Sequence, residues 1–201
     1  GVAVLDSGVD ATHPDLIHKD LAAAQGLQPK TVENVKFLDA SGGLLVDGAE
    51  FYAPAVNSDT TSGHGTHVAG IVGGTGQDSG DRYAGIAPGA NLIGLGAGDG
   101  ANIFSALAGL EWIHRNHQAH NIRVVNNSWG AVGAYDPENV VSQAVRTLIE
   151  DDGIVVVFAA GNSGGDGSAI ATNKYANDPK VINVANLDDY TGWAYSGSSR
   201  G

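Results

Sequence analysis

Short runs of apolar, largely β-branched residues recur along the chain with helical segments between them, and this alternation narrows the possible folds more than any other feature. The runs are residues 2–5, 35–38, 91–95, 122–125, 154–158 and 181–184. Near-continuous apolar runs are typical of strands that are buried on both faces of a parallel sheet. The sequence therefore predicts an α/β fold, with a doubly wound, mostly parallel sheet and helices on both faces.

Three segments between these runs have the spacing of helices. Residues 101–117 and 137–150 place apolar side chains close to helical periodicity, and Pro137 after Asp136 is typical of a helix start. Residues 64–74 combine a similar pattern with glycines and alanines, which allow close packing. We expect this third helix to be buried.

The length of the chain is sufficient for one domain with a well-buried core. No shift in composition divides the 201 residues, so we expect one compact domain. The chain opens within an apolar run and ends within a glycine- and serine-rich stretch. We therefore expect a domain that is cut at both ends.

The composition excludes several classes of partner and site. Lys and Arg number 10 against 22 Asp and Glu, for a net charge of -12, and no basic cluster is present, so nucleic acid is excluded. No apolar stretch is long enough to cross a membrane. The absence of cysteine excludes disulfides and thiolate sites. The acidic balance is typical of a secreted or salt-tolerant protein, and we expect an extracellular location.

Asp6 directly follows the first apolar run, in the sequence Leu-Asp-Ser-Gly of residues 5–8. The carboxyl ends of strands are where sites form in open α/β sheets. An aspartate after a strand is, however, more often a turn former or a helix cap. Asp6 alone does not identify a site.

His64 lies at the start of the glycine-rich helix, in the sequence Ser-Gly-His-Gly-Thr-His-Val-Ala-Gly of residues 62–70. Imidazole is the usual proton carrier near neutral pH. The alternatives are a structural histidine or a metal pair with His67. A zinc hydrolase helix has a glutamate between its two histidines, and none is present here. We expect His64 to be a base and His67 to pack inside.

Asn162 follows the apolar run at 154–158 through an Ala-Ala-Gly sequence. Its amide is a donor suited to the negative oxygen that develops when a carbonyl is attacked. The alternative is an Asx turn at the end of a strand, which the sequence Asn-Ser-Gly favours when it is considered alone.

Taken together and in this order, the motifs at Asp6, His64 and Asn162 resemble those of the subtilisin-like serine proteases, the subtilase family. Residues 85–89, Gly-Ile-Ala-Pro-Gly, and 126–130, Asn-Asn-Ser-Trp-Gly, also resemble that family. The resemblance implies the family's three-layer α/β fold. It also implies that residues 1–201 are part of a subtilisin-like peptidase domain.

The resemblance implies a serine endopeptidase that hydrolyses peptide bonds through an Asp-His-Ser mechanism. In that mechanism His64 accepts the proton of a serine hydroxyl, Asp6 fixes the tautomer of the ring, and Asn162 donates to the tetrahedral oxygen. The implied partners are a protein or peptide substrate and an N-terminal propeptide. No cofactor is required. Calcium is an option because Asp78 and Asp81 lie in a polar loop, but we assign no metal ligand.

The resemblance also implies residues that bind substrate. Ser128, Trp129 and Gly130 are similar to the segment that pairs with an extended peptide by strand addition. Ala159, Ala160 and Gly161 are similar to one wall of the first specificity pocket. Small residues leave this pocket open, so we expect an apolar or aromatic residue before the cleaved bond. For Trp129 the alternative is ordinary packing.

The serine nucleophile of this family lies in a Gly-Thr-Ser motif, and none follows Asn162. Ser163 and Ser199 both fit the pattern Gly-x-Ser-x-Gly, but that pattern belongs to hydrolases in which the serine precedes the acid and the histidine. We interpret Ser199 as structural and expect the isolated fragment to be inactive. The alternatives are a peptide-binding pseudoprotease and a nucleotide-binding domain, and the latter lacks its glycine fingerprint.

Overall fold

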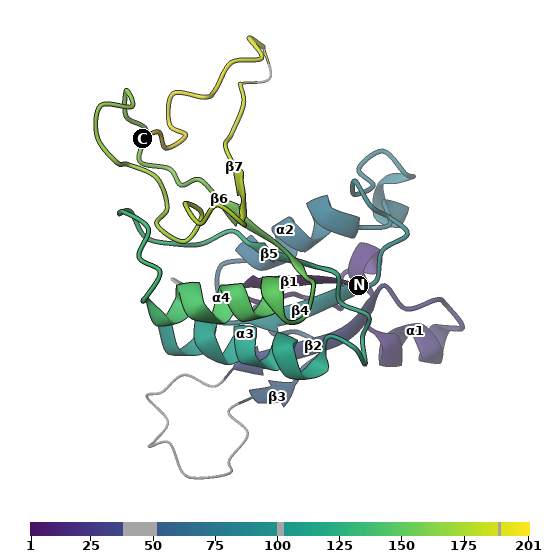
Figure 1. The fold of residues 1–201 in the computed structure, drawn as a ribbon. Coiled ribbons are helices and arrows are strands. Elements are labelled where there is room, and N and C mark those ends of the chain that lie inside the picture. Colours follow the sequence, from purple (N-terminus) through teal and green to yellow (C-terminus); the bar gives the residue numbers. More distant parts are fainter. Residues whose placement is uncertain (38–51, 100–102, 189) are drawn as a thin grey trace. The chain divides into compact units, whose positions relative to one another are not determined.

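The computed structural model describes residues 1–37, 52–99, 103–188 and 190–201. The chain divides into two compact units, residues 1–125 and 126–201. Figure 1 shows the elements of both units, and each unit is described separately below. Among the described residues, no helix is both long and apolar enough to cross a bilayer.

The sheet of the first unit contains strands β1 (Val2–Asp6), β2 (Thr31–Phe37), β3 (Tyr52–Pro54) and β4 (Leu92–Gly96), in the order β3-β2-β4-β1. Strands β1 and β2 both pair with β4 in parallel, which confirms the predicted sheet. The sequence did not indicate β3, a short strand that pairs antiparallel with β2. It ends in a proline, which has no N–H to donate to a neighbouring strand and is therefore found at sheet edges rather than in central strands.

Helices cover both faces of β1 in this unit. Helix α2 (His64–Gly73) packs on the face that contains Val4. Helix α3 (Ile103–Asn116) packs on the face of Leu5, so closely that a Cβ on Gly109 would lie 2.4 Å from Leu5 Cδ1. Because successive strand residues point to opposite faces, the two helices lie on opposite sides of β1. Both were predicted to within two residues, although positions 101 and 102 of the expected helix lie outside the described residues.

Short helical elements of this unit were not predicted. Helix α1 (Lys19–Gln25) begins after His18 and ends at Gly26, which has the left-handed conformation common after helices. The 3-10 helices η1 (Pro14–Leu16) and η3 (Gln77–Ser79) are single turns. Elements this short have too few residues to show an apolar period.

The second unit contains strands β6 (Val155–Ala159) and β7 (Ile182–Val184), which pair in parallel, and the unit boundary falls within β5 (Val124–Asn127). Helix α4 (Val140–Glu150) packs against β6. It starts after Asn139, whose Oδ1 accepts from Val141 N at 3.0 Å, so the expected start at Pro137 was three residues early. Strand β7 is exposed, in contrast to the burial expected for most strands.

The positions of the predicted strands are confirmed in both units. The runs at 35–38 and 122–125 differ most in their bounds, because β2 starts at Thr31 and β5 spans Val124–Asn127; residue 38 lies outside the described residues. Thr31 has no exposed surface and its hydroxyl donates to Leu16 O at 2.8 Å, so a buried polar side chain extends the strand where the apolar pattern gave no indication.

We expect His18 to make the stability of the first unit depend on pH. Its imidazole is buried at the start of α1, where Nδ1 accepts from Asp20 N. Burial lowers the pKa of His18 below the ordinary histidine value of 6.5. The charges of Asp20 and Glu33 raise this pKa and that of Lys19 lowers it, without cancelling the effect of burial. The unfolded chain therefore binds the proton at a higher pH than the folded chain does.

We predict that the free energy of unfolding is highest above the unfolded pKa of His18 and decreases as the pH falls through it toward the lower folded pKa. His18→Asn keeps a side-chain acceptor for the helix start but does not titrate. Between about pH 7.5 and about pH 5.5, urea unfolding of the variant should lose less stability than the wild type. Equal losses in the two proteins would contradict this assignment.

Candidate active site

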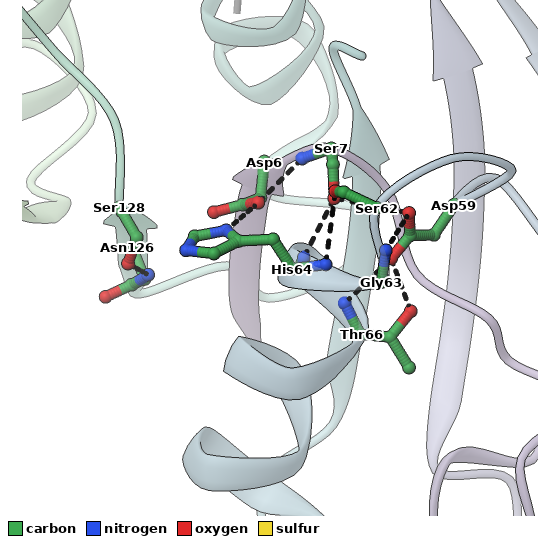
Figure 2. Close-up of polar contacts among 10 residues, drawn as sticks. Asp6, Ser7, Asp59, Ser62, Gly63, His64, Thr66, Asn126 and Ser128 are labelled. Carbon is green, nitrogen blue, oxygen red and sulfur yellow. Dashed lines mark hydrogen bonds and ion pairs between the residues drawn. The ribbon is translucent and has the colours of Figure 1, made fainter. Parts of the chain in front are cut away.

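Asp6 and His64 form a close hydrogen-bonded pair in the first unit (Figure 2). The carboxylate lies at the carboxyl end of β1, and its Oδ1 is 2.6 Å from His64 Nδ1. The same oxygen accepts from Ser7 N at 2.7 Å. The side chain of Asp6 is only 4% exposed, whereas that of His64 is 54% exposed. The pair therefore consists of a fixed, buried acceptor and an accessible ring.

This contact determines how the histidine ring can act. A carboxylate can only accept, so the hydrogen bond places the proton of neutral His64 on Nδ1. Nε2 then has the free lone pair and can accept a proton. Asp6 would also stabilise the imidazolium that results. This is the geometry of a general base with an orienting acid.

The glycines beside these residues are required by the close approach of β1 and α2. A Cβ on Gly65 would lie 2.2 Å from Gly8 O, and a Cβ on Gly8 would lie 2.4 Å from the backbone of Ser58. Gly8 also has a φ of 134°, which residues with a side chain rarely adopt. The flanking glycines thus allow the first turn of α2 to contact the end of β1.

The expectation that His67 packs inside is wrong. His67 is exposed and lines a pocket of about 790 Å³ on the surface of the first unit. The helix has its buried residues at Gly65, Ala69 and Gly73, a stripe that does not include position 67. Across the described ranges, no three His, Cys, Asp or Glu side chains gather as metal ligands.

The residues expected to bind substrate come together in the second unit, around a pocket of about 180 Å³. Its lining consists of Ser128, Trp129, Gly130, Ala131, Val132, Ala159, Gly161, Asn162, Ser163 and Asn173. Ala160 is not part of this lining. It is buried, and its backbone N donates to Val184 O at 2.8 Å. Ala160 faces away from the pocket because alternate residues of an extended segment point in opposite directions.

The Trp129 ring packs as in an ordinary aromatic core. Its centroid lies 5.1 Å from that of Phe158 and 5.8 Å from that of Tyr175, in edge-to-face arrangements. Such pairs are favourable because the positive ring edge meets the negative ring face. The packing interpretation therefore holds for the side chain, while the residue also lines the pocket.

Asn173 was not identified from the sequence, yet it joins the two walls of this pocket. Its buried Nδ2 donates to Trp129 O and to Ala159 O, both at 2.9 Å. A Cβ on Gly130 would lie 2.1 Å from the same amide nitrogen. An asparagine in a polar stretch is usually a turn former, so only the folded chain reveals this role.

The family model described as Peptidase_S8, the subtilase family, matches residues 1–201. The chain belongs to the subtilase family. Among its relatives, Fervidolysin of Fervidobacterium pennivorans is 32% identical over 95% of this chain and 24% of that protein. Subtilisin E of Bacillus subtilis strain 168 is 34% identical over 91% of this chain and 39% of that protein.

Solved structures agree with the family assignment. S41 Psychrophilic Protease matches with a TM-score of 0.71 and 27% identity, over 100% of this chain and 58% of that chain. Sphericase matches with a TM-score of 0.71 and 25% identity, over 100% of this chain and 59% of that chain. The chain thus has the three-layer α/β fold of the subtilases, and it spans less than two thirds of the length of these relatives.

The two serines in Gly-x-Ser-x-Gly sequences contact each other in this subtilase. Ser199 is buried, and its Oγ accepts from Ser163 N at 2.9 Å. Ser199 N in turn donates to Gly161 O. These bonds tie residues 161–163 to the end of the chain, which supports a structural role for Ser199. Ser163 lies in the same loop as Asn162 and lines the same pocket.

Asp99 is a further charged group near His64 that the sequence did not indicate. It is exposed, and hydrogen bonds from Ser62 and then Thr61 lower its pKa, as does the charge of His64. The carboxylate therefore lies close to Ser62 and Thr61, shortly before α2, and adds negative charge near His64. A single aspartate in a glycine-rich loop gives no pattern from which this proximity could be predicted.

Gly65→Ala should disrupt the junction of β1 and α2, because the added methyl overlaps the carbonyl oxygen of Gly8. We predict a loss of about 1–3 kcal/mol in the free energy of unfolding, as for other overpacked sites. Gly70→Ala is the matched control, since it lies in the same helix with open space around its Cβ. The control should gain about 0.5–1 kcal/mol in urea unfolding. Similar effects of the two changes would contradict the packing argument.

Proposed function

We propose that the protein of which this chain is a part is a serine endopeptidase that uses Asp6, His64 and a serine from outside the 201 residues. The observation that carries this proposal is the 2.6 Å contact between Asp6 Oδ1 and His64 Nδ1. Membership of the subtilase family supports the reaction class. Among the residues of the chain itself, no serine follows Asn162 in a Gly-Thr-Ser sequence.

In the proposed reaction, His64 Nε2 takes the hydroxyl proton of the serine while the serine oxygen attacks the carbonyl carbon of the substrate. The resulting negative oxygen accepts a hydrogen bond from the amide of Asn162. His64 then gives its proton to the leaving amine, and the peptide bond breaks. A water molecule then attacks the acyl carbon while His64 takes its proton, and His64 returns that proton to the serine oxygen as the acid product leaves.

We propose that the pocket of the second unit accepts the side chain before the cleaved bond. The pocket is small, at about 180 Å³, and the wall formed by Ala159 and Gly161 has no polar side chain, although Ser128, Asn162, Ser163 and Asn173 line other parts of the pocket. This supports a preference for an apolar residue. Asn173 supports the rigidity of the pocket because one buried amide fastens both walls. Ser128 to Gly130 would pair with the backbone of the extended substrate.

Asp6→Asn should abolish most of the peptidase activity of the full-length protein. The neutral amide removes the negative charge that would stabilise the imidazolium, and in the orientation that donates to His64 Nδ1 it favours the tautomer with the proton on Nε2, which cannot act as a base. The expected loss in kcat is about 10⁴-fold. Asp151→Asn, at an exposed position after α4, is the control and should leave kcat unchanged. A loss of less than about tenfold for Asp6→Asn would refute the proposed role.

Labelling with a fluorophosphonate tests where the nucleophile lies. We predict that the 201-residue chain takes up no label and cleaves no casein, whereas the full-length protein does both. Labelling of the full-length protein should disappear on substitution of its Gly-Thr-Ser serine. A full-length protein that binds peptides but takes no label would instead be a pseudoprotease, and robust cleavage by the 201 residues alone would overturn our interpretation of the serines.

We also propose an extracellular location for the protein. Its support is the acidic composition, with a net charge of -12, which keeps an isolated protein soluble. Recovery of the full-length protein from the culture medium, rather than from washed cells, would test this proposal.

A further inference from the structure

We propose that Asp59 is a positioning residue for the Asp6–His64 pair, which it reaches through the start of α2 and through Ser7. The inference rests on the proposed function in so far as it treats Asp6 and His64 as a catalytic pair. Asp59 is 7% exposed, and none of the motifs that indicate the family includes it. Figure 2 shows its carboxylate between the turn after β1 and the first turn of α2.

Both oxygens of Asp59 are occupied by donors from these two segments. Oδ1 accepts from Gly63 N at 3.1 Å and from Ser7 Oγ at 3.3 Å. Oδ2 accepts from Thr66 N at 3.2 Å and from Thr66 Oγ1 at 2.7 Å. A buried carboxylate with four donors is held in one position, because any rotation leaves buried polar groups unpaired.

Asp59 takes the place of the cap that α2 lacks. The residue before the helix is Gly63, which has a φ of 75° and no side chain to cap the first turn. Backbone N–H groups of a first turn need acceptors from outside the helix. Asp59 Oδ2 supplies one for Thr66, and its negative charge lies where the helix dipole is positive. The orientation of the turn that bears His64 thus depends on this carboxylate.

Ser7 links Asp59 to the catalytic carboxylate. Its hydroxyl donates to Asp59 Oδ1 and accepts from Gly65 N at 2.8 Å, so its single proton is committed. The backbone N of the same residue donates to Asp6 Oδ1, the oxygen that binds His64. A shift of Asp59 would therefore move both partners of the catalytic pair, one through Ser7 and the other through α2.

A second link runs through Thr66. Its hydroxyl donates to Asp59 Oδ2 and accepts from Asp10 N at 2.9 Å, four residues beyond Asp6 in the chain. The turn after β1 is thus bound to α2 at two points, through the hydroxyls of Ser7 and Thr66, and both hydroxyls donate to Asp59. One buried side chain fixes the distance between the strand that bears the acid and the helix that bears the base.

Asp59→Asn in the full-length protein tests this inference. The amide nitrogen would face a backbone N–H in either orientation, that of Gly63 or that of Thr66, so one donor would be left unpaired. We expect kcat to fall by about 10²-fold with little change in KM, because small misplacements of catalytic groups have costs of this size. The low-field proton resonance of His64 Nδ1–H, assigned by its absence in Asp6→Asn, should exchange with water faster or broaden beyond detection.

Two further variants separate positioning from stability. Asn139→Ala removes the cap of α4 and should cost about 1 kcal/mol of stability without changing kcat or the His64 resonance. Ser7→Ala removes only one of the two links and should lower kcat less than Asp59→Asn does. If Asp59→Asn fails to fold, kcat and the His64 resonance of Ser7→Ala test the inference in its place. The double variant Ser7→Ala with Asp59→Asn should lose less than the product of the two single losses, since both act on one network.

The resonance makes the outcome independent of the proposed function, because it is read in the protein whether or not peptides are cleaved. An unchanged resonance in a folded Asp59→Asn protein, with kcat within about twofold of wild type, would overturn the inference and leave the peptidase proposal intact. Independent, multiplicative effects of the two substitutions would also overturn it. A wild type that takes no fluorophosphonate label would instead refute the proposed function.

Discussion

The close approach of β1 and α2 is the constraint on which the rest of the first unit depends. The hydrogen bond between Asp6 and His64 forms only because the first turn of α2 meets the end of β1 at Gly8 and Gly65, where a side chain would overlap the backbone. The buried face of α2 then completes a small apolar cluster with β1 and β4. The Asp6–His64 contact and the core packing thus have one geometric origin.

The polar groups at this junction explain how a short, glycine-rich helix can hold His64, the proposed general base, on a fixed backbone. Glycine gives a helix little intrinsic stability because it loses much conformational freedom on folding. Here Ser62, Ser7 and Asp59 each accept from one N–H of the first turn, so the exposed His64 ring projects from a firmly bound backbone. In the second unit, Asn173 has a comparable function, because a single buried amide holds two backbone segments around a pocket.

The sequence predicted the sheet well because buried parallel strands are apolar throughout, and it predicted α2, α3 and α4 because each is long enough to show a period. It failed where the deciding contacts are not local. The start of α4 depends on the Asn139 cap rather than on Pro137. His67 faces outward because the buried stripe of α2 consists of Gly65, Ala69 and Gly73 and does not include position 67. The short elements α1 and β3 have too few residues to show a pattern.

The sequence by itself determined the fold class through its strand pattern, and its local motifs indicated the family and, through that resemblance, the pairing of Asp6 with His64. Only the tertiary structure decided which polar side chains serve that pair and the pocket. Asp59 and Asn173 lie outside every motif, and each acts by bonding to backbone atoms of segments distant in sequence. Such bonds leave no periodic or local pattern, since any polar residue of the right length could make them once the fold has brought the segments together.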